Sequence, residues 1–306
     1  MAGTAAGAAS LDEAVLGGWR PAKRRGLLAQ IWRYALQKRL GTAGALILLV
    51  LFAVGLFAPV IAPYGPNEST NQFYVGPSMA YPMGTDHLGR DLLSRVIAGA
   101  RISLQVSILA VILGTGVGAA AGVISGYFGR WIDMMIQRIV DVLLALPGIL
   151  LALTISAALG ASLRNVIIAI GIGIIPNAAR IVRSAVLTTK ENQYIEAAIV
   201  VGANSNRVMW THILPNVMAP IIVVASIQLG GAILAEASLS YLGLGVPLNV
   251  PSWGSMLSGS ALRYMIKAPW MAIFPGLALS LVVLGINLFG DALRDVLDPR
   301  LRRGRG

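Results

Sequence analysis

The sequence predicts an all-α membrane protein with six transmembrane helices and both termini in the cytoplasm. Of its 306 residues, 56% are hydrophobic and only 12% are charged, a balance that excludes an ordinary soluble domain. The apolar residues form runs near the ~20-residue length of a bilayer-crossing helix. Short alternating segments, the pattern of a membrane β-barrel, are not visible. Lys and Arg gather mostly in the loops of one side, which orients the chain.

The N-terminal segment, residues 1–40, is predicted to lie in the cytoplasm ahead of a transmembrane domain, residues 41–306. The segment begins with small, polar and basic residues and has no apolar core, so it does not resemble a cleaved signal peptide. We expect disorder through about Gly18. Residues 27–40 then mix apolar and basic side chains at helical spacing, which is typical of an interfacial helix. A frayed basic tail is the alternative.

Six charge-poor runs are predicted to cross the membrane. They lie at about residues 43–62, 102–129, 135–160, 165–186, 216–239 and 268–290. Pro147 falls inside the third run, where proline can kink a membrane helix. The fourth run ends in polar residues, including Asn177 and Arg180, which indicates burial in the bundle or emergence into water.

Two further features concern packing between these spans. Glycines recur every four residues in the second run, which predicts one helical face that a neighbouring helix approaches closely, with a flexible gate as the alternative. These glycines are Gly114, Gly118, Gly122 and Gly126.

Residues 243–268 are predicted to be a loop with a short re-entrant or surface helix. We expect Trp253 to anchor that loop at the membrane interface, with stacking on a solute as the alternative.

The side of each loop follows from the basic residues. Of the 24 Lys and Arg residues, 18 fall on the side of the termini and 6 on the other side. The positive-inside rule therefore places both termini and the segment 190–215 in the cytoplasm. The net charge of +11 is explained by this topology, so no nucleic-acid partner is predicted.

The sequence predicts no catalytic residues and no metal-binding residues in this chain. The chain has no cysteine and only two histidines, which excludes thiolate metal sites and disfavours histidine sites. It also lacks the G-x-x-x-x-G-K-[ST] phosphate loop, so it does not hydrolyse ATP by that route. Asp86 and His87 can be interpreted as an acid–base pair, but an ion-paired, turn-capping cluster of Asp86, Arg90 and Asp91 is favoured.

Asp141 and Glu236 are the acidic residues nearest the membrane interior. Charge inside a membrane is costly and usually functional, so contact with the transported solute is one interpretation. Interhelical pairing, or a position near the interface, is the other interpretation. For Glu236 a further alternative is that it stabilises the outer end of the fifth span.

The segment 190–215 is predicted to form two short helices joined by a turn. Gly202 permits a tight turn that a Cβ would strain. Asn204 or Ser205 can cap a second helix that runs through Trp210, lying parallel to the membrane. Pro215 then begins the fifth span, where its missing N–H costs little. An ordinary amphipathic connector is the alternative.

This segment resembles the EAA loop of ABC importer permeases. E-A-A at 196–198, Gly202 and Leu-Pro at 214–215 have the family spacing, whereas His212 replaces the usual Ile. Four further motifs, in the family's order, are similar to the second, C-type permease of the dipeptide/oligopeptide/nickel family. They are GTDHLGRDLLSR at 84–95, EASLSYLGLG at 236–245, PSWG at 251–254 and DALRDVLDPRLR at 291–302.

The resemblance implies the type I importer fold and a set of residues that couple the permease to ATPase chains. That set is Glu196, Ala197, Ala198, Gly202, Ala203, Asn204, Arg207, His212, Leu214 and Pro215. The implied partners are a homologous second permease, two cytoplasmic ATPase subunits that carry ATP and Mg²⁺, an extracytoplasmic solute-binding protein and the lipid membrane. No cofactor is expected on this chain.

The expected function is therefore ATP-driven import of short peptides or a related solute across a bacterial or archaeal cytoplasmic membrane. The chain itself performs no covalent chemistry. Nickel chelates or another small solute are the alternative cargo within the family. A gradient-driven secondary transporter or channel is the alternative from another class, although we find no internal repeat of the kind that many such transporters contain.

Overall fold

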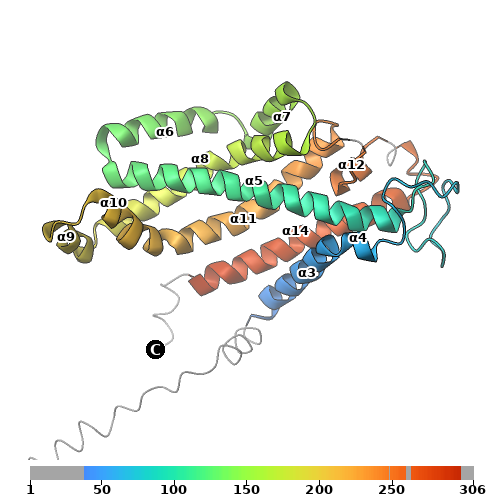
Figure 1. Cartoon of the computed structure of the whole chain (residues 1–306), viewed down its shortest axis with the longest axis horizontal. Coiled ribbons are helices and arrows are strands. Elements are labelled where there is room, and N and C mark those ends of the chain that lie inside the picture. The colour runs from blue at the N-terminus through green and yellow to red at the C-terminus, as the bar shows by residue number, and fades with distance from the viewer. Residues whose placement is uncertain (1–37, 248, 260–262, 298–306) are drawn as a thin grey trace, which may run out of the picture. The chain divides into compact units, whose positions relative to one another are not determined.

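The structure, a computed structural model, describes residues 38–247, 249–259 and 263–297 and folds them mainly into helices (Figure 1). The predicted interfacial helix therefore lies outside the described residues, except for its last positions. The helices are α3 (Arg39–Leu56), α4 (Ala58–Ile61), α5 (Leu92–Phe128), α6 (Arg130–Leu144), α7 (Gly148–Leu159), α8 (Leu163–Lys190), α9 (Gln193–Val200), α10 (Ser205–Arg207), the π-helix η1 (Val208–Ile213), α11 (Leu214–Tyr241), α12 (Trp253–Leu257) and α14 (Trp270–Leu297).

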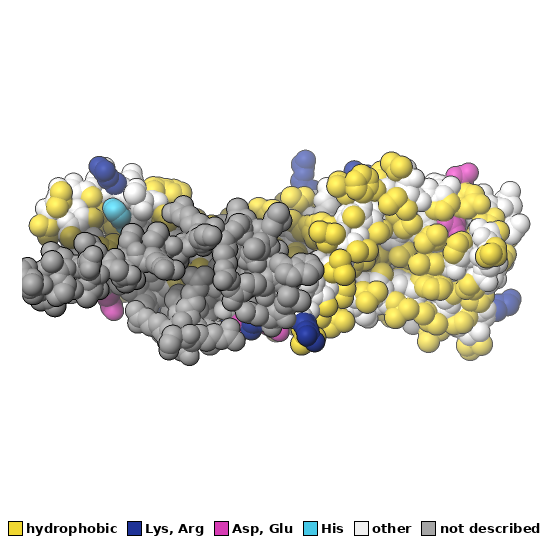
Figure 2. Space-filling view, turned by 90° about the horizontal axis from the view of Figure 1, so that it is seen from below, with side chains coloured by type: hydrophobic (Ala, Val, Ile, Leu, Met, Phe, Trp, Pro, Cys, Tyr) yellow, Lys and Arg dark blue, Asp and Glu magenta, His cyan; other side chains and the backbone are white. Residues whose placement is uncertain are grey.

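Five of the described helices are long and apolar enough to cross a membrane. They are α3, α5, α8, the continuous helix Ser205–Tyr241 and α14. The pair α6 and α7 makes a sixth span if it is counted as one. Figure 2 shows hydrophobic side chains covering much of the surface in the right-hand part of the view, away from the end where α9 and α10 lie. The predicted all-α membrane class is confirmed.

The third span differs from the prediction, which was one kinked helix over residues 135–160. α6 and α7 are separate helices that meet at an angle of 84°. Pro147 is the N-cap of α7, with extended backbone (φ −53°, ψ 130°). Proline disfavours helical backbone at the residue before it, so Leu146 is not helical and α6 ends at Leu144 instead of bending through Pro147.

The helix that contains the second predicted span, residues 102–129, begins ten residues earlier, at Leu92. α5 starts at Leu92 because Asp91 caps it: a carboxylate oxygen of Asp91 accepts hydrogen bonds from the Ser94 backbone N–H (2.8 Å) and hydroxyl (2.6 Å). The charged Arg95 and Arg101 are therefore helical. With 37 residues, α5 is about 55 Å long and exceeds the ~30 Å apolar core of a bilayer.

The glycines of α5 lie directly against α8, and the two helices run side by side in Figure 1. A Cβ on Gly118 would lie 2.6 Å from the carbonyl oxygen of Ile175 and 2.7 Å from the Cβ of Ala178. A Cβ on Gly114 would lie 2.5 Å from the carbonyl oxygen of Gly171. Gly122 and Gly126 meet the next turns of α8 in the same way, so backbone packs on backbone along this contact.

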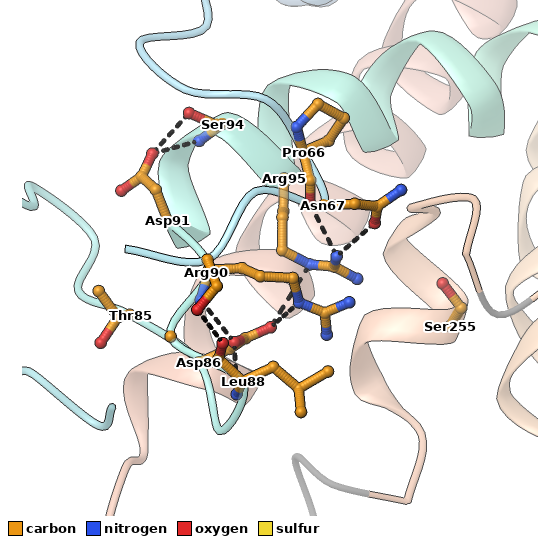
Figure 3. Close-up of polar contacts among 12 residues, drawn as sticks. Pro66, Asn67, Thr85, Asp86, Leu88, Arg90, Asp91, Ser94, Arg95 and Ser255 are labelled. Atoms are coloured by element: carbon orange, nitrogen blue, oxygen red, sulfur yellow. Dashed lines mark hydrogen bonds and ion pairs between the residues drawn. The ribbon is translucent and has the colours of Figure 1, made fainter. Parts of the chain in front are cut away.

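The end of the bundle that the basic residues place outside, here called the outer end, contains a turn built around Asp86 (Figure 3). One carboxylate oxygen of Asp86 accepts the backbone N–H groups of Leu88 (2.8 Å) and Arg90 (2.9 Å). The other accepts Arg90 Nε (2.7 Å) and lies 3.7 Å from Arg95 Nε. This arrangement is the ion-paired, turn-capping cluster that the sequence predicts.

Trp253 is buried, so the prediction that it anchors a loop at the membrane interface is wrong. It begins the short helix α12, and its side chain is 1% exposed. Its indole Nε1 donates a hydrogen bond to the carbonyl of Val96 (3.1 Å), and its backbone N–H donates to Ser103 Oγ (3.3 Å). Trp253 therefore fastens α12 to α5 inside the bundle, where its N–H still finds a partner.

The close α5–α8 contact predicts that Gly118→Ala destabilises the bundle. The added methyl meets the Ile175 carbonyl, a backbone atom that cannot rotate away, and overpacking of this kind costs about 1–3 kcal/mol. Gly116→Ala is the matched control, because a Cβ there meets no heavy atom within 4 Å. Thermal unfolding in detergent should show a lower Tm for Gly118→Ala alone. Equal Tm values would contradict the contact.

The outer end also predicts a dependence of stability on pH. Burial lowers the pKa of His87 below its usual 6.5, and Arg90 and Arg95 act in the same direction, against Asp86. The unfolded chain therefore binds a proton more readily than the folded chain, so stability is lost as the pH falls below about 6.5. His87→Gln should reduce the drop in Tm between about pH 7.5 and pH 5.5. His212→Gln, the control, should keep the wild-type drop; an unchanged drop in His87→Gln would refute this assignment.

Candidate functional site

The loop between α8 and α11, residues 191–213, is held to the bundle by a buried apolar base. Ile195 of α9 and Val208 and Ile213 of η1 are each 0% exposed. They pack in one cluster with Val186 of α8 and Val217 of α11. Figure 1 places α9 and α10 at one end of the bundle, opposite α4 and α12. The loop is therefore continuous with the core of that end.

The E-A-A…G-A residues of the loop form a Schellman motif, a standard way to end a helix. Gly202 has φ +91°, and its N–H donates to the carbonyl of Ile199 (2.9 Å). The N–H of Ala203 donates to the carbonyl of Ala198 (3.0 Å). A Cβ on Gly202 would meet no heavy atom within 4 Å, so this position needs glycine for its backbone angle and not for space.

The second half of the loop differs from the prediction of a separate short helix ending at Trp210. The Asn204 side chain caps the helix by accepting the Arg207 N–H (2.9 Å), as predicted. From Ser205, however, the helix continues through η1 into α11. The N–H of Leu214 reaches back five residues to Met209, and this wider turn comes just before Pro215, which has no N–H to donate.

The loop exposes three large apolar side chains beside polar ones such as Glu196 and Arg207. Val200 is 85% exposed, Val201 87% and Trp210 68%. The side chain of Glu196, also exposed, makes no hydrogen bond or ion pair with any residue that the structure describes. We refer to Val200, Val201 and Trp210 as the apolar tip. Exposed apolar side chains on a well-anchored segment are typical of a protein contact surface.

The remaining residues of the predicted coupling set lie on the same segment. Ala197 and Arg207 are exposed, and Leu214 is half-buried against the apolar base. His212, the departure from the family pattern, is half-buried, and its carbonyl accepts a hydrogen bond from Asn216 Nδ2 (2.6 Å). The structure therefore brings all ten residues of the set into one continuous segment.

A hollow of about 260 Å³ lies between α7, α8 and α11. Its walls are mainly apolar, with Asn177, Gln228 and Ser238 as the polar lining residues. No local pattern in the sequence connects these three residues. Asn177 and Gln228 are uncharged amides in different spans, each of which also carries other polar residues, and only the packing of α8 on α11 places both around the same hollow.

Neither Asp141 nor Glu236 lines this hollow. Asp141 of α6 pairs with Arg180 of α8 at 2.7 Å, and both side chains are about half exposed, so this is an interhelical pair. Glu236 of α11 is 0% exposed, and one of its carboxylate oxygens accepts a hydrogen bond from the Ser240 hydroxyl (2.7 Å). The other oxygen has no hydrogen-bond partner among the described residues.

A second polar contact between α6 and α8 was missed by the sequence analysis. Asp133 accepts a hydrogen bond from Arg183 Nε (2.6 Å) and pairs with its Nη2 as well. The Ser125 hydroxyl of α5 donates to the same carboxylate (2.9 Å). This network joins three helices near the 191–213 loop. The sequence separates Asp133 from Arg183 by 50 residues, so no local pattern indicates the pair.

Comparison with known proteins identifies the family. The family model described as "binding-protein-dependent transport system inner membrane component" matches residues 118–303. The model described as "N-terminal TM domain of oligopeptide transport permease C" matches residues 26–77. Together they cover most of the chain and include the 191–213 loop, α3 and the hollow.

Similar proteins agree with this assignment. The dipeptide transport system permease protein DppC of Alkalihalophilus pseudofirmus is 44% identical over 277 residues, which span 89% of this chain and 90% of that protein. The glutathione transport system permease protein GsiD of Pectobacterium atrosepticum is 42% identical over 275 residues, with 89% and 91% coverage.

A solved structure shows the same fold at lower sequence identity. It is an inward-facing crystal form of the MetNI methionine ABC transporter, with a TM-score of 0.54 and 21% identity over 68% of this chain and 98% of that one. The chain therefore belongs to the family of binding-protein-dependent transport system inner membrane components, as a multi-pass ABC importer permease of the C type, a transport subunit that is not itself an enzyme.

Proposed function

We propose that this permease imports short peptides across the cytoplasmic membrane of a bacterium or archaeon, driven by ATP that separate ATPase chains hydrolyse. The observation that carries the proposal is the apolar tip of the 191–213 loop, exposed on a buried base. Such a tip suits insertion into a groove of a partner protein. Because the chain has no phosphate loop, that partner supplies the ATP and Mg²⁺ site.

The packing of the loop allows a movement of its tip to be transmitted to the membrane spans. Its base packs with Val186 at the end of α8 and Val217 at the start of α11, so the loop and both helices move together. The same two helices line the hollow that contains Asn177 and Gln228. Closure of two ATPases would thus change access to the hollow, as alternating access requires. A homologous second permease would supply the other half of the pathway.

The choice of short peptides rests on the named relatives and on the hollow. Relatives above 40% identity over most of this chain are named for dipeptide and glutathione transport. Asn177, Gln228 and Ser238 offer uncharged donors and acceptors, which suit peptide groups without demanding a fixed solute charge. A solute-binding protein outside would set the final selectivity. No observation in the structure favours nickel chelates or a gradient-driven mechanism.

Val201→Asp tests the apolar tip. Val201 is 87% exposed, so the folded chain tolerates a carboxylate there, whereas an apolar groove of a partner does not. We expect the variant to reach the membrane normally but to lose co-purifying ATPase subunits and ATP-dependent dipeptide uptake by at least about tenfold. Gln193→Glu, an exposed acidic change at the start of the same helix α9, is the control and should behave as wild type. Normal uptake by Val201→Asp, or uptake without ATPase chains, would refute the proposal.

The turn at Gly202 predicts an order among three residues at that position. The left-handed backbone costs an L-residue roughly 1–2 kcal/mol, and asparagine tolerates it better than alanine. Solute-stimulated ATPase activity of the reconstituted complex should therefore fall in the order glycine, Gly202→Asn, Gly202→Ala. Steric clash does not contribute, because a Cβ meets no atom there. If Gly202→Ala and Gly202→Asn were equally active, the turn geometry would not matter for coupling.

A further inference from the structure

The outer end of the bundle contains a second pocket, of about 330 Å³, that the proposed pathway does not use. We call it the outer pocket. Its lining includes residues of the Asp86 turn, the start of α5 and the segment around α12. The polar lining residues are Asp86, His87, Arg90, Arg95, Ser255 and Ser258. None of them lines the hollow between α7, α8 and α11.

Positive charge is in excess in the outer pocket. Arg90 and Arg95 both line it, and among the residues that the structure describes Asp86 is the one acidic residue in the lining. Asp91 is 1% exposed, does not line the pocket and is bonded to Ser94. The pocket therefore holds two guanidinium groups around a single carboxylate, which favours a bound anion.

Arg90 retains donors for such an anion. Its Nε is occupied by Asp86 (2.7 Å), whereas neither of its Nη groups donates a hydrogen bond to a residue that the structure describes. Figure 3 shows the Arg90 guanidinium extending from Asp86 toward the side where Ser255 lies. Arg95 is fixed behind it by hydrogen bonds from Nη1 to the Pro66 carbonyl (2.9 Å) and Asn67 Oδ1 (3.3 Å). The free Nη pair of Arg90 has the planar geometry that matches a carboxylate.

One further polar atom at this pocket lacks a partner. His87 lines the pocket, and its Nδ1 is buried without a hydrogen bond to any described residue. Its ring stacks on Tyr264, with ring centroids 6.1 Å apart. An unpaired buried donor or acceptor costs free energy, so a ligand that pairs with it is favoured.

We propose that the outer pocket receives an Asp or Glu side chain of the extracytoplasmic solute-binding protein, with the Arg90 Nη groups as its main donors. This inference rests on the proposed function, which requires such a partner. The pocket adds what the family assignment does not supply, namely a docking position and the charge of the residue that occupies it.

The surroundings of the pocket favour a protein carboxylate over a small free anion. The outer segments carry six basic residues against three acidic ones, and the third acid, Glu68, is occupied with the Gly65 N–H (3.0 Å). A positive face of this kind steers an acidic protein surface toward it. Next to Tyr264, Met265 is 54% exposed and Ile266 fully exposed, which supplies apolar contact area that a small anion does not need.

The test uses the complete transporter, with its second permease and ATPase chains, in nanodiscs. The Kd of the solute-loaded cognate binding protein is measured for Arg90→Gln, Ser258→Glu and Arg101→Gln. Ser258→Glu places a competing carboxylate at the pocket and keeps every Asp86 hydrogen bond. Both pocket variants should weaken binding by at least about tenfold. Arg101→Gln, which removes an exposed charge of α5 outside the pocket, should change it less than about twofold.

A double-mutant cycle then identifies the contact. Each surface Asp and Glu of the binding protein is changed to Ala and measured against wild type and Arg90→Gln. Removal of one carboxylate should raise the Kd for the wild-type transporter and leave the Kd for Arg90→Gln unchanged. Absence of coupling, or binding within about twofold of wild type for both pocket variants, overturns the docking role and leaves the proposed function standing. Stabilisation of the complex by acetate without any coupled carboxylate would make the pocket a free-anion site, which also overturns docking. If wild type neither binds the protein nor responds to it in ATPase activity, the proposed function fails as well.

Discussion

The contact between α5 and α8 is the constraint on which the rest of the structure depends. Four glycines bring the two backbones so close that an added methyl would lie within 2.9 Å of α8 at each position. Inside a membrane the hydrophobic effect does not drive helices together, so van der Waals contact of this density must do so. One end of this helix pair leads into the 191–213 loop, and the other lies beside the outer segments. A shift of one helix along the other would displace both regions.

The outer turn and the 191–213 loop are held in place by different interactions. At the outer end, Asp86 and Asp91 satisfy backbone N–H groups and arginines, so that irregular chain is fixed by hydrogen bonds. At the other end, Ile195 and Val208 fix the loop by apolar burial and leave its tip exposed. Apolar packing is not directional and allows a small tilt, whereas a network of charged hydrogen bonds keeps its geometry. The loop is therefore suited to move with a motor protein, and the outer turn to remain in place.

Prediction from sequence succeeded where a local pattern carries its own physical reason. The glycine spacing, the capping role of Asn204 and the turn at Gly202 all follow from short-range geometry. It failed where the reason lies between distant segments. Trp253 was interpreted as an interface aromatic, and only the position of α5 shows that the Val96 carbonyl accepts its indole N–H. The predicted span starts at residue 102 because charged residues count against a span, and the sequence did not show that the helix α5 begins at Leu92, with Arg95 paired inside the protein.

The class of protein, the approximate spans, the family and the segment proposed to meet the ATPases could all be predicted without coordinates. These depend on composition, on runs of apolar residues and on motifs that are contiguous in the chain. The complete break between α6 and α7 at Pro147, the hollow shared by Asn177 and Gln228, and the unused donors of Arg90 at the outer pocket are visible only in the folded chain. The hollow and the pocket depend on which segments pack together, and a bilayer-spanning run of apolar residues does not encode its neighbour.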